Sequence, residues 1–299
     1  MDERSFLTIL RRLPLHPGAA NLYDDTATLA GLTITTDTIV EGIHFLPDDP
    51  PRDVAWKLLA TNLSDLAAKG ATPEGALLNY PLSDDAWDST FLAGLDAALR
   101  QFACPLLGGD TVTLPPGAPR VLTLTAIGRD AAAPPRSAAT AGDALWVTGT
   151  IGDAGAGLAI ARGEDGPAEL LAAYRRPQPR LAEGCALAPL VHAMMDVSDG
   201  LLIDAARMAA ASGLAVTVDL AAVPLSDAYR RFRGDDRAAR MAAATAGDDY
   251  QLLFAAAPDF APPVAATCVG RFATGTGLTV TDDGASVPLP ARLGFEHAA

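Results

Sequence analysis

Two carboxylates stand three residues apart in the stretch MMDVSDGLLIDAARMAA (residues 194–210), just before an apolar run that predicts a helix. Asp196 and Asp199 would repel each other there unless a positive group lies beside them. Further aspartates stand where elements are expected to begin or end: Asp24, Asp25, Asp37, Asp110, Asp248 and Asp249. Carboxylates that converge at the ends of elements are how proteins hold hard cations such as Mg²⁺. The pattern therefore predicts a site for several divalent cations.

Each of these features has a simpler alternative when it is taken alone. An Asp before a helix is more often an N-cap than a ligand, and Gly-Gly-Asp or Gly-Asp-Asp is more often a turn. Asp65 is different because it lies inside a predicted helix, with Asn62 and Lys69 at helical spacing on the same side. Cations held by carboxylates commonly bridge to phosphates. The usual nucleotide signatures, a P-loop, a kinase H-R-D and an ordered G-x-G-x-x-G, are nevertheless absent from the sequence.

The composition limits the partners. Thirty-six acidic residues oppose 22 basic ones, and the net charge of -14 would repel the phosphates of a nucleic acid. No apolar run reaches the roughly 18 to 20 residues that a membrane span needs. The three cysteines form no C-x-x-C pair, which fits a reducing compartment. We expect a cytoplasmic protein that binds neither nucleic acid nor membrane.

Strands and helices alternate in both halves of the chain. Alternating apolar patterns predict strands at 32–36, 121–127, 144–149, 214–220, 250–256 and 267–272. Helical spacing predicts helices at 53–69, 86–103 and 201–211. The Ala-, Pro- and Gly-rich stretch 129–143 reads as a link between domains. The expected fold class is α/β (α+β), with one domain at 1–137 and a second at 138–299.

Taken in order, these residues resemble the thiamine-monophosphate kinase family, of the superfamily that includes aminoimidazole-ribonucleotide synthetase and selenophosphate synthetase. The resemblance is carried by these blocks: DDTATL, TTDTIVEGIHF, ATNLSDLAAKGA, LLGGDTV, WVTGTIGDAGAGLAI, RRPQPR, DVSDGL and GDDYQLLF. It implies an N-terminal domain that contributes strands to a barrel-like interface of a homodimer, and a C-terminal α/β domain. It also implies that ATP and thiamine monophosphate meet in a cleft with several Mg²⁺ ions, in the last step of thiamine diphosphate biosynthesis.

The resemblance assigns roles by motif position. The metal ligands would be Asp25, Thr35, Thr36, Asp37, Asp65, Asp110, Asp196 and Asp199. ATP would be contacted by Gly109, Asp110, Arg136 and Ser198. The thiamine substrate would be contacted by His44, Asp248 and Phe295. In the family pattern a Glu stands at the position of Asp248, so this carboxylate reaches about one methylene less.

The chemistry agrees with these assignments. A phosphate monoester has a second pKa of about 6, so the acceptor phosphate is already ionised at neutral pH and needs no general base. What the reaction needs is relief of the repulsion between two polyanions, which bound cations supply. Two alternatives stay open from the sequence: another ATP-cleaving synthetase of the superfamily, and a non-catalytic Mg²⁺- and nucleotide-binding module.

Overall fold

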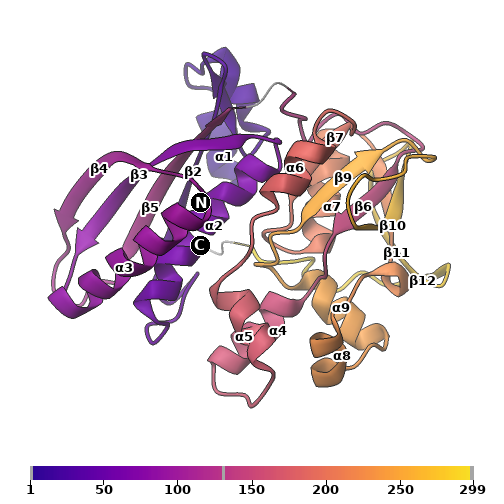
Figure 1. Cartoon of the computed structure of the whole chain (residues 1–299). Helices are drawn as coiled ribbons and strands as arrows, with labels where there is room; N and C mark the ends of the chain where they lie inside the picture. Colours follow the sequence, from indigo (N-terminus) through magenta and orange to yellow (C-terminus); the bar gives the residue numbers. More distant parts are fainter. Residues whose placement is uncertain (1–2, 130–131, 297–299) are drawn as a thin grey trace.

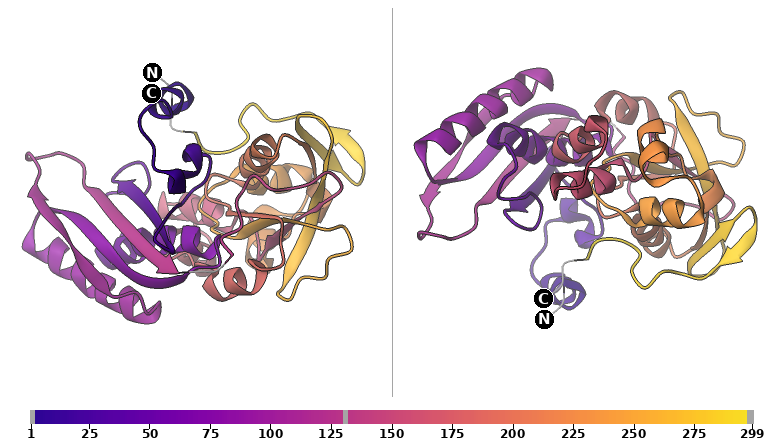
Figure 2. Two further views of the ribbon diagram at one scale, coloured as in Figure 1. Left: turned by 90° about the horizontal axis from the view of Figure 1, so that it is seen from above. Right: turned by 90° about the horizontal axis from the view of Figure 1, so that it is seen from below.

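Two β-sheets, one formed before residue 130 and the other after residue 143, organise the two halves of the chain, which lie side by side in all three views (Figure 1 and Figure 2). The structure is a computed structural model that describes residues 3–129 and 132–296. The N-terminal elements are α1 (Glu3–Leu10), the helical turn η1 (Pro17–Leu22), β1 (Ala27–Leu29), β2 (Leu32–Val40), α2 (Pro51–Ala67), β3 (Thr72–Leu82), α3 (Asp85–Gln101), β4 (Leu106–Thr113) and β5 (Val121–Arg129). The strand order of this first sheet is β1-β2-β5-β3-β4, and only the β3–β4 pair is parallel.

The second sheet has seven strands and is also mixed. Its half of the chain contains β6 (Ala144–Thr148), α4 (Asp153–Ala161), α5 (Ala168–Arg175), α6 (Leu181–Leu187), β7 (Ala193–Asp196), α7 (Leu201–Ala211), β8 (Ala215–Asp219), η2 (Leu220–Ala222), α8 (Asp227–Arg233), α9 (Arg237–Thr245), β9 (Leu252–Ala256), β10 (Ala266–Ala273), β11 (Gly277–Asp282) and β12 (Ala285–Val287). The strand order is β12-β11-β8-β10-β6-β9-β7, with β8 and β11 parallel. The predicted α/β (α+β) class is confirmed.

Helix α2 lies between the two halves and joins their cores (Figure 1). Every residue from Val54 to Ala67 is buried, which is typical of a helix covered on all sides. One side packs on the first sheet, and the end of the helix packs with residues of the second half such as Leu187 and Phe254. The approach to α6 is close, because a Cβ on Gly184 would lie 2.0 Å from the carbonyl oxygen of Ala67. The position of α2 lets its polar side chains reach both halves.

The segment that follows α5 crosses over to the N-terminal half and is fastened there. Asp49 accepts hydrogen bonds from the hydroxyl of Tyr174 and from Nε of Arg175, each at 2.9 Å. Trp56 on α2 donates from Nε1 to the carbonyl oxygen of Pro177 at 2.8 Å. We call residues 174–180, which contain the RRPQPR motif, the α5–α6 bracket. The bracket fixes the two halves to each other beside α2, which packs against both.

The sequence placed two aspartates at the ends of elements, and the structure corrects this. Asp37 lies inside β2, which continues to Val40, and Asp110 lies inside β4. Strand β2 extends past the polar residues because Ile39 buries its side chain against the core while the backbone stays paired with β5. No helix in the two described ranges, 3–129 and 132–296, is long and apolar enough to cross a lipid bilayer.

Candidate active site

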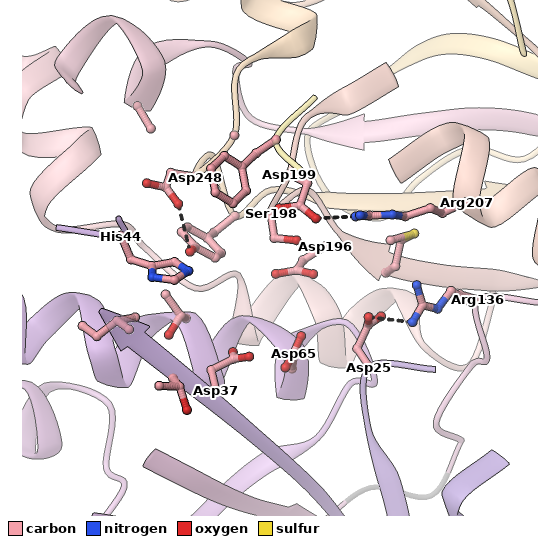
Figure 3. Close-up of a pocket in the computed structure, with 18 of the residues that line it drawn as sticks. Asp25, Asp37, His44, Asp65, Arg136, Asp196, Ser198, Asp199, Arg207 and Asp248 are labelled. Carbon is pink, nitrogen blue, oxygen red and sulfur yellow. Dashed lines mark hydrogen bonds and ion pairs between the residues drawn. The ribbon is translucent and has the colours of Figure 1, made fainter. Parts of the chain in front are cut away.

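A cavity of about 1110 Å³ lies where the two halves meet. Its walls come from β2 and α2 of the first half, from the β7–α7 turn and α7 of the second, and from the segment before β9. Ten residues predicted from the sequence line it: Asp25, Asp37, His44, Asp65, Arg136, Asp196, Ser198, Asp199, Asp248 and Phe295. Figure 3 shows His44 and Asp248 at one end, Asp37, Asp65 and Asp196 in the middle, and Arg136 and Arg207 at the other end.

The middle of the cavity concentrates negative charge. Burial, followed by the charges of Asp25 and Asp199, raises the pKa of Asp37 from its ordinary 3.8 to about 6. Burial and the charge of Asp25 raise the pKa of Asp196 to about 8. Burial, followed by the charges of Asp37 and Asp196, raises the pKa of Asp65 well above its ordinary value. These carboxylates come from β2, α2 and β7, so both halves contribute to one repulsive cluster.

Hydroxyl groups hold two of the buried carboxylates in place. The Thr35 hydroxyl donates to Oδ2 of Asp65 at 2.5 Å, and the Ser64 hydroxyl donates to Oδ2 of Asp196 at 2.6 Å. Alternation along β2 turns Thr35 toward Asp65. Thr35 therefore supports the cluster from just outside the cavity lining.

The donor set fits hard cations. Oδ2 of Asp25 is buried and has no hydrogen-bond partner, although the other oxygen of this carboxylate pairs with Arg136. A buried, unpaired carboxylate oxygen is costly unless something positive meets it. In the described part of the chain no three Asp, Glu, His or Cys side chains stand close enough together to hold an ion as they are placed. The chemistry of the donors, all oxygen and mutually repelling, is that of a Mg²⁺ site, while the ligand geometry is not assembled.

Asp199 does not cap the helix that follows it. No side-chain hydrogen bond caps α7; the backbone N–H groups of Asp199 and Gly200, just before the helix, donate to Oδ2 of the buried Asp204 at 3.1 Å. The Asp199 carboxylate instead forms an ion pair with Arg207, which also binds Asp204 at 2.9 Å. The carboxylate of Asp199 thus faces the cavity and is held by Arg207, about two helical turns further along.

Arg136 and Ser198, the predicted ATP contacts with side chains in the cavity, lie on its far and central parts (Figure 3). An Nη of Arg136 lies 2.9 Å from the Asp25 carboxylate, so the link residue is fixed by an ion pair. Together with Arg207, Arg136 makes this end of the cavity the cationic one. Such an end suits the phosphates of a nucleotide.

The opposite end combines a ring, a carboxylate and a buried lysine. The rings of His44 and Phe295 lie 6.4 Å apart between centroids. Asp248 is fixed on both oxygens, by Lys57 at 2.6 Å and by the hydroxyl of Tyr250 at 3.1 Å. This end has the apolar and polar features that would suit a heteroaromatic ring.

Three predicted residues lie away from the cavity. Thr36, Gly109 and Asp110 are on the first sheet, and alternation places Thr36 and Asp110 on the face opposite to Asp37. Gly109 shares a row with Asp37 but lies three strands away, a distance of about 14 Å at the usual strand spacing. One chain alone therefore does not bring these three residues to the carboxylate cluster.

Four charged or polar groups in or beside the site were given no role from the sequence. They are Lys57, Lys69, Tyr250 and Arg207. A signal existed for two of them: the chain has only two lysines, both on the same predicted helix, among twenty arginines. In the structure both lysines are buried, at 2% and 1% exposure, and each pairs with an aspartate of a different loop.

Known proteins with similar sequences and folds agree with this geometry. Residues 23–129 match the N-terminal domain, and residues 140–280 the C-terminal domain, of the AIR synthase related proteins. Thiamine-monophosphate kinase of Caulobacter vibrioides is 41% identical, covering 94% of this chain and 86% of its own, and that of Escherichia coli K12 is 39% identical, covering 90% and 87%.

A solved structure, AaThiL complexed with AMPPCP and TMP, superposes with a TM-score of 0.88 at 29% identity, over 99% of this chain and 97% of its own. Hydrogenase maturation protein HypE in complex with ATP, at 20% identity and a TM-score of 0.72, shares the fold. On these matches, which span both halves and the whole cavity, the chain belongs to the thiamine-monophosphate kinases of the AIR synthase related family.

Proposed function

We propose that the chain transfers the terminal phosphate of ATP to thiamine monophosphate and so forms thiamine diphosphate and ADP. The observation that carries this proposal is the order of groups along the cavity, with arginines at one end, carboxylates in the middle and His44 and Asp248 at the other (Figure 3). The ring of Phe295 lies beside that of His44. Two ligands with phosphates that meet in the middle would fill such a cavity from its two ends. The relatives named above, and the ligands of the AaThiL complex, support the same reaction.

The chain's own groups bind and orient the two phosphates. Arg136 and Arg207 would receive the phosphates of ATP, with Ser198 on the turn between β7 and α7. His44 and Phe295 would hold the ring of the second substrate and point its phosphate toward the carboxylates. No residue has to remove a proton, because the acceptor oxygen is ionised at neutral pH. Alignment of the two phosphates is the main contribution of the protein.

Mg²⁺ fits the middle of the cavity. We expect it to be held by oxygens of Asp25, Asp37, Asp65, Asp196 and Asp199, with Thr35 supporting Asp65. When bound, Mg²⁺ would supply the positive charge that lets two polyanionic phosphates approach each other. The raised pKa values of Asp37 and Asp196 support this proposal because their causes, burial and neighbouring carboxylates, are what a bound cation would offset.

We also propose a homodimer in which the open face of the first sheet is covered by a second copy. All eight residues of β4 are exposed, among them Leu106, Leu107 and Val112 at 47%, 57% and 50%. An edge strand this apolar invites pairing. Thr36 and Asp110 share the open face, so pairing with a second copy is also the way in which these residues and Gly109 could serve a site.

We also propose that the chain divides into two domains at 137/138, since each part contains one of the two sheets.

Product identity tests the proposed function. Purified protein with ATP, Mg²⁺ and thiamine monophosphate should give thiamine diphosphate and ADP in equal amounts, with no free phosphate. Free phosphate in place of thiamine diphosphate would point to a synthetase-type reaction, and no loss of ATP would point to a binding module.

Light scattering tests the proposed homodimer. It should give the mass of two chains for the wild type, and Val112→Glu on the open face should lower it to the mass of one chain.

A further inference from the structure

Lys57 carries a buried charge that the proposed reaction leaves unused. Its side chain rises from α2 and is 2% exposed. Nζ donates to Oδ2 of Asp248 at 2.6 Å and to the carbonyl oxygen of His44 at 2.9 Å, and it lies 4.1 Å from the centroid of the Tyr174 ring. Lys57 therefore touches two of the three residues predicted for the thiamine substrate.

Stability alone does not explain an ammonium group at this position. Removing two charges from water is expensive, and apolar side chains of similar size are often no less stable than a buried ion pair. The surrounding residues of α2 are apolar and buried, so a Met or Leu would fit the local pattern of the helix. An ammonium group that is buried here despite this cost indicates that the carboxylate of Asp248 requires it as a partner.

The backbone around Asp248 is also forced into an unusual shape. Asp248 and Tyr250 have φ values of 69° and 49°, in the left-handed region that residues other than glycine rarely adopt. Their backbone N–H groups donate to the carbonyl oxygens of Ser198 and Val197, each at 2.8 Å, which holds the turn against the β7–α7 segment. With the Tyr250 hydroxyl on its second oxygen, the Asp248 carboxylate is fixed in one orientation toward the cavity.

We propose that Lys57 is a positioning residue that sets the affinity for the ring of the thiamine substrate through Asp248. The inference rests on the proposed function and adds a determinant of substrate affinity to it. Lys57 compensates the charge of Asp248 and orients it, and the lone pairs that remain can accept the amino N–H groups on a heteroaromatic ring of a cationic substrate. The nucleotide end of the cavity is not touched.

The test compares Lys57→Met with the wild type, with Asp248→Asn, and with the double variant. Arg237→Gln serves as the control, because it breaks an ion pair with Asp282 on the exposed surface of the C-terminal half. Calorimetry measures the Kd of thiamine monophosphate, and steady-state kinetics give KM for each substrate. We expect Lys57→Met to weaken Kd and KM for thiamine monophosphate at least about tenfold, the usual effect of losing one charged hydrogen bond. KM for ATP should stay within about twofold.

The double variant separates positioning from a general structural role. If Lys57 acts through Asp248, the double variant should bind thiamine monophosphate no more weakly than Asp248→Asn alone. Additive losses, equal changes in both KM values, or no change would each overturn the proposal. If Lys57→Met does not fold, the double variant, which lacks the unpaired charge, carries the comparison with Asp248→Asn. Absence of thiamine diphosphate with the wild type would instead refute the proposed function, independently of Lys57.

Discussion

Replacing Lys69 tests how much stability is lost when a buried ion pair beside the site loses one of its two partners. Nζ of Lys69 lies 2.5 Å from Asp24 and 3.2 Å from the carbonyl oxygens of Pro134 and Met194, so it joins the first acidic loop, the link and β7. The side chains of Lys69 and Asp24 are only 1% and 12% exposed. Lys69→Met would therefore leave a buried carboxylate without its cation.

The expected loss follows from that burial. Removing one partner of a buried ion pair costs about 3–5 kcal/mol of unfolding free energy. In a chain of this size about 1 kcal/mol shifts Tm by roughly 2–4 °C, so Tm should fall by roughly 6–20 °C. In Lys69→Met/Asp24→Asn the orphan charge is gone, and the Asn oxygen can still accept the N–H of Asp25, as Asp24 does at 2.9 Å. The double variant should recover most of the loss.

Scanning calorimetry of the wild type, the single variants and the double variant measures both effects. Two outcomes would refute the reasoning: a single variant as stable as the wild type, or a double variant that loses as much as the two single variants added together.

Three further predictions concern the carboxylates and the packing of the two halves. Asp199→Asn should lower kcat about 10²- to 10³-fold, as expected for one group that stabilises charge in the transition state, whereas Asp165→Asn on an exposed loop should change it little; equal kcat values would remove Asp199 from the site. Without divalent ions, stability should fall as pH rises from about 4 to about 8: the unfolded carboxylates ionise near their ordinary pKa, while Asp37 and Asp196 hold their protons to about 6 and about 8, so the folded state binds more protons in this window. Added Mg²⁺ should raise Tm more at pH 8 than at pH 5, and a Tm independent of pH would contradict the cluster. Gly184→Ala should destabilise the protein by at least about 1 kcal/mol in urea unfolding, because its Cβ would meet the carbonyl oxygen of Ala67 at 2.0 Å; an unfolding free energy equal to that of the wild type would contradict this close packing.

The fold was largely readable from local patterns. Helix 201–211 and the strands near 144–148 and 252–256 have apolar residues at the spacing of their element, and the structure places them within two residues of the prediction. Asp37 was predicted at a strand end because the alternating pattern of residues 32–36 runs directly into it. The pairing of β2 with β5 continues past it, and a long-range pairing of that kind has no local signal.

The site was readable where a residue type alone suggests chemistry. Aspartates beside Gly, Ser or Thr marked the carboxylate cluster, and ten of the fourteen predicted residues line one cavity. The supporting groups could not be found in the same way. Lys57, Tyr250 and Arg207 matter only because of which carboxylate each one meets, and those meetings depend on how the two halves pack. Gly109 and Asp110 of β4 are the reverse case. Their motif, LLGGDTV, is evident in the sequence, but within one chain they lie far from the carboxylate cluster.

The α5–α6 bracket has a consequence for hybrid proteins assembled from related chains. Asp49 and Trp56 belong to the first half by sequence, yet the groups that satisfy them, at Tyr174, Arg175 and Pro177, arrive with the second. A crossover at the link would exchange one side of these contacts and keep the other. A hybrid chain should fold only when both of its parents have matching residues at these contacts. The segment that can be exchanged between related chains is therefore larger than the part that forms either sheet.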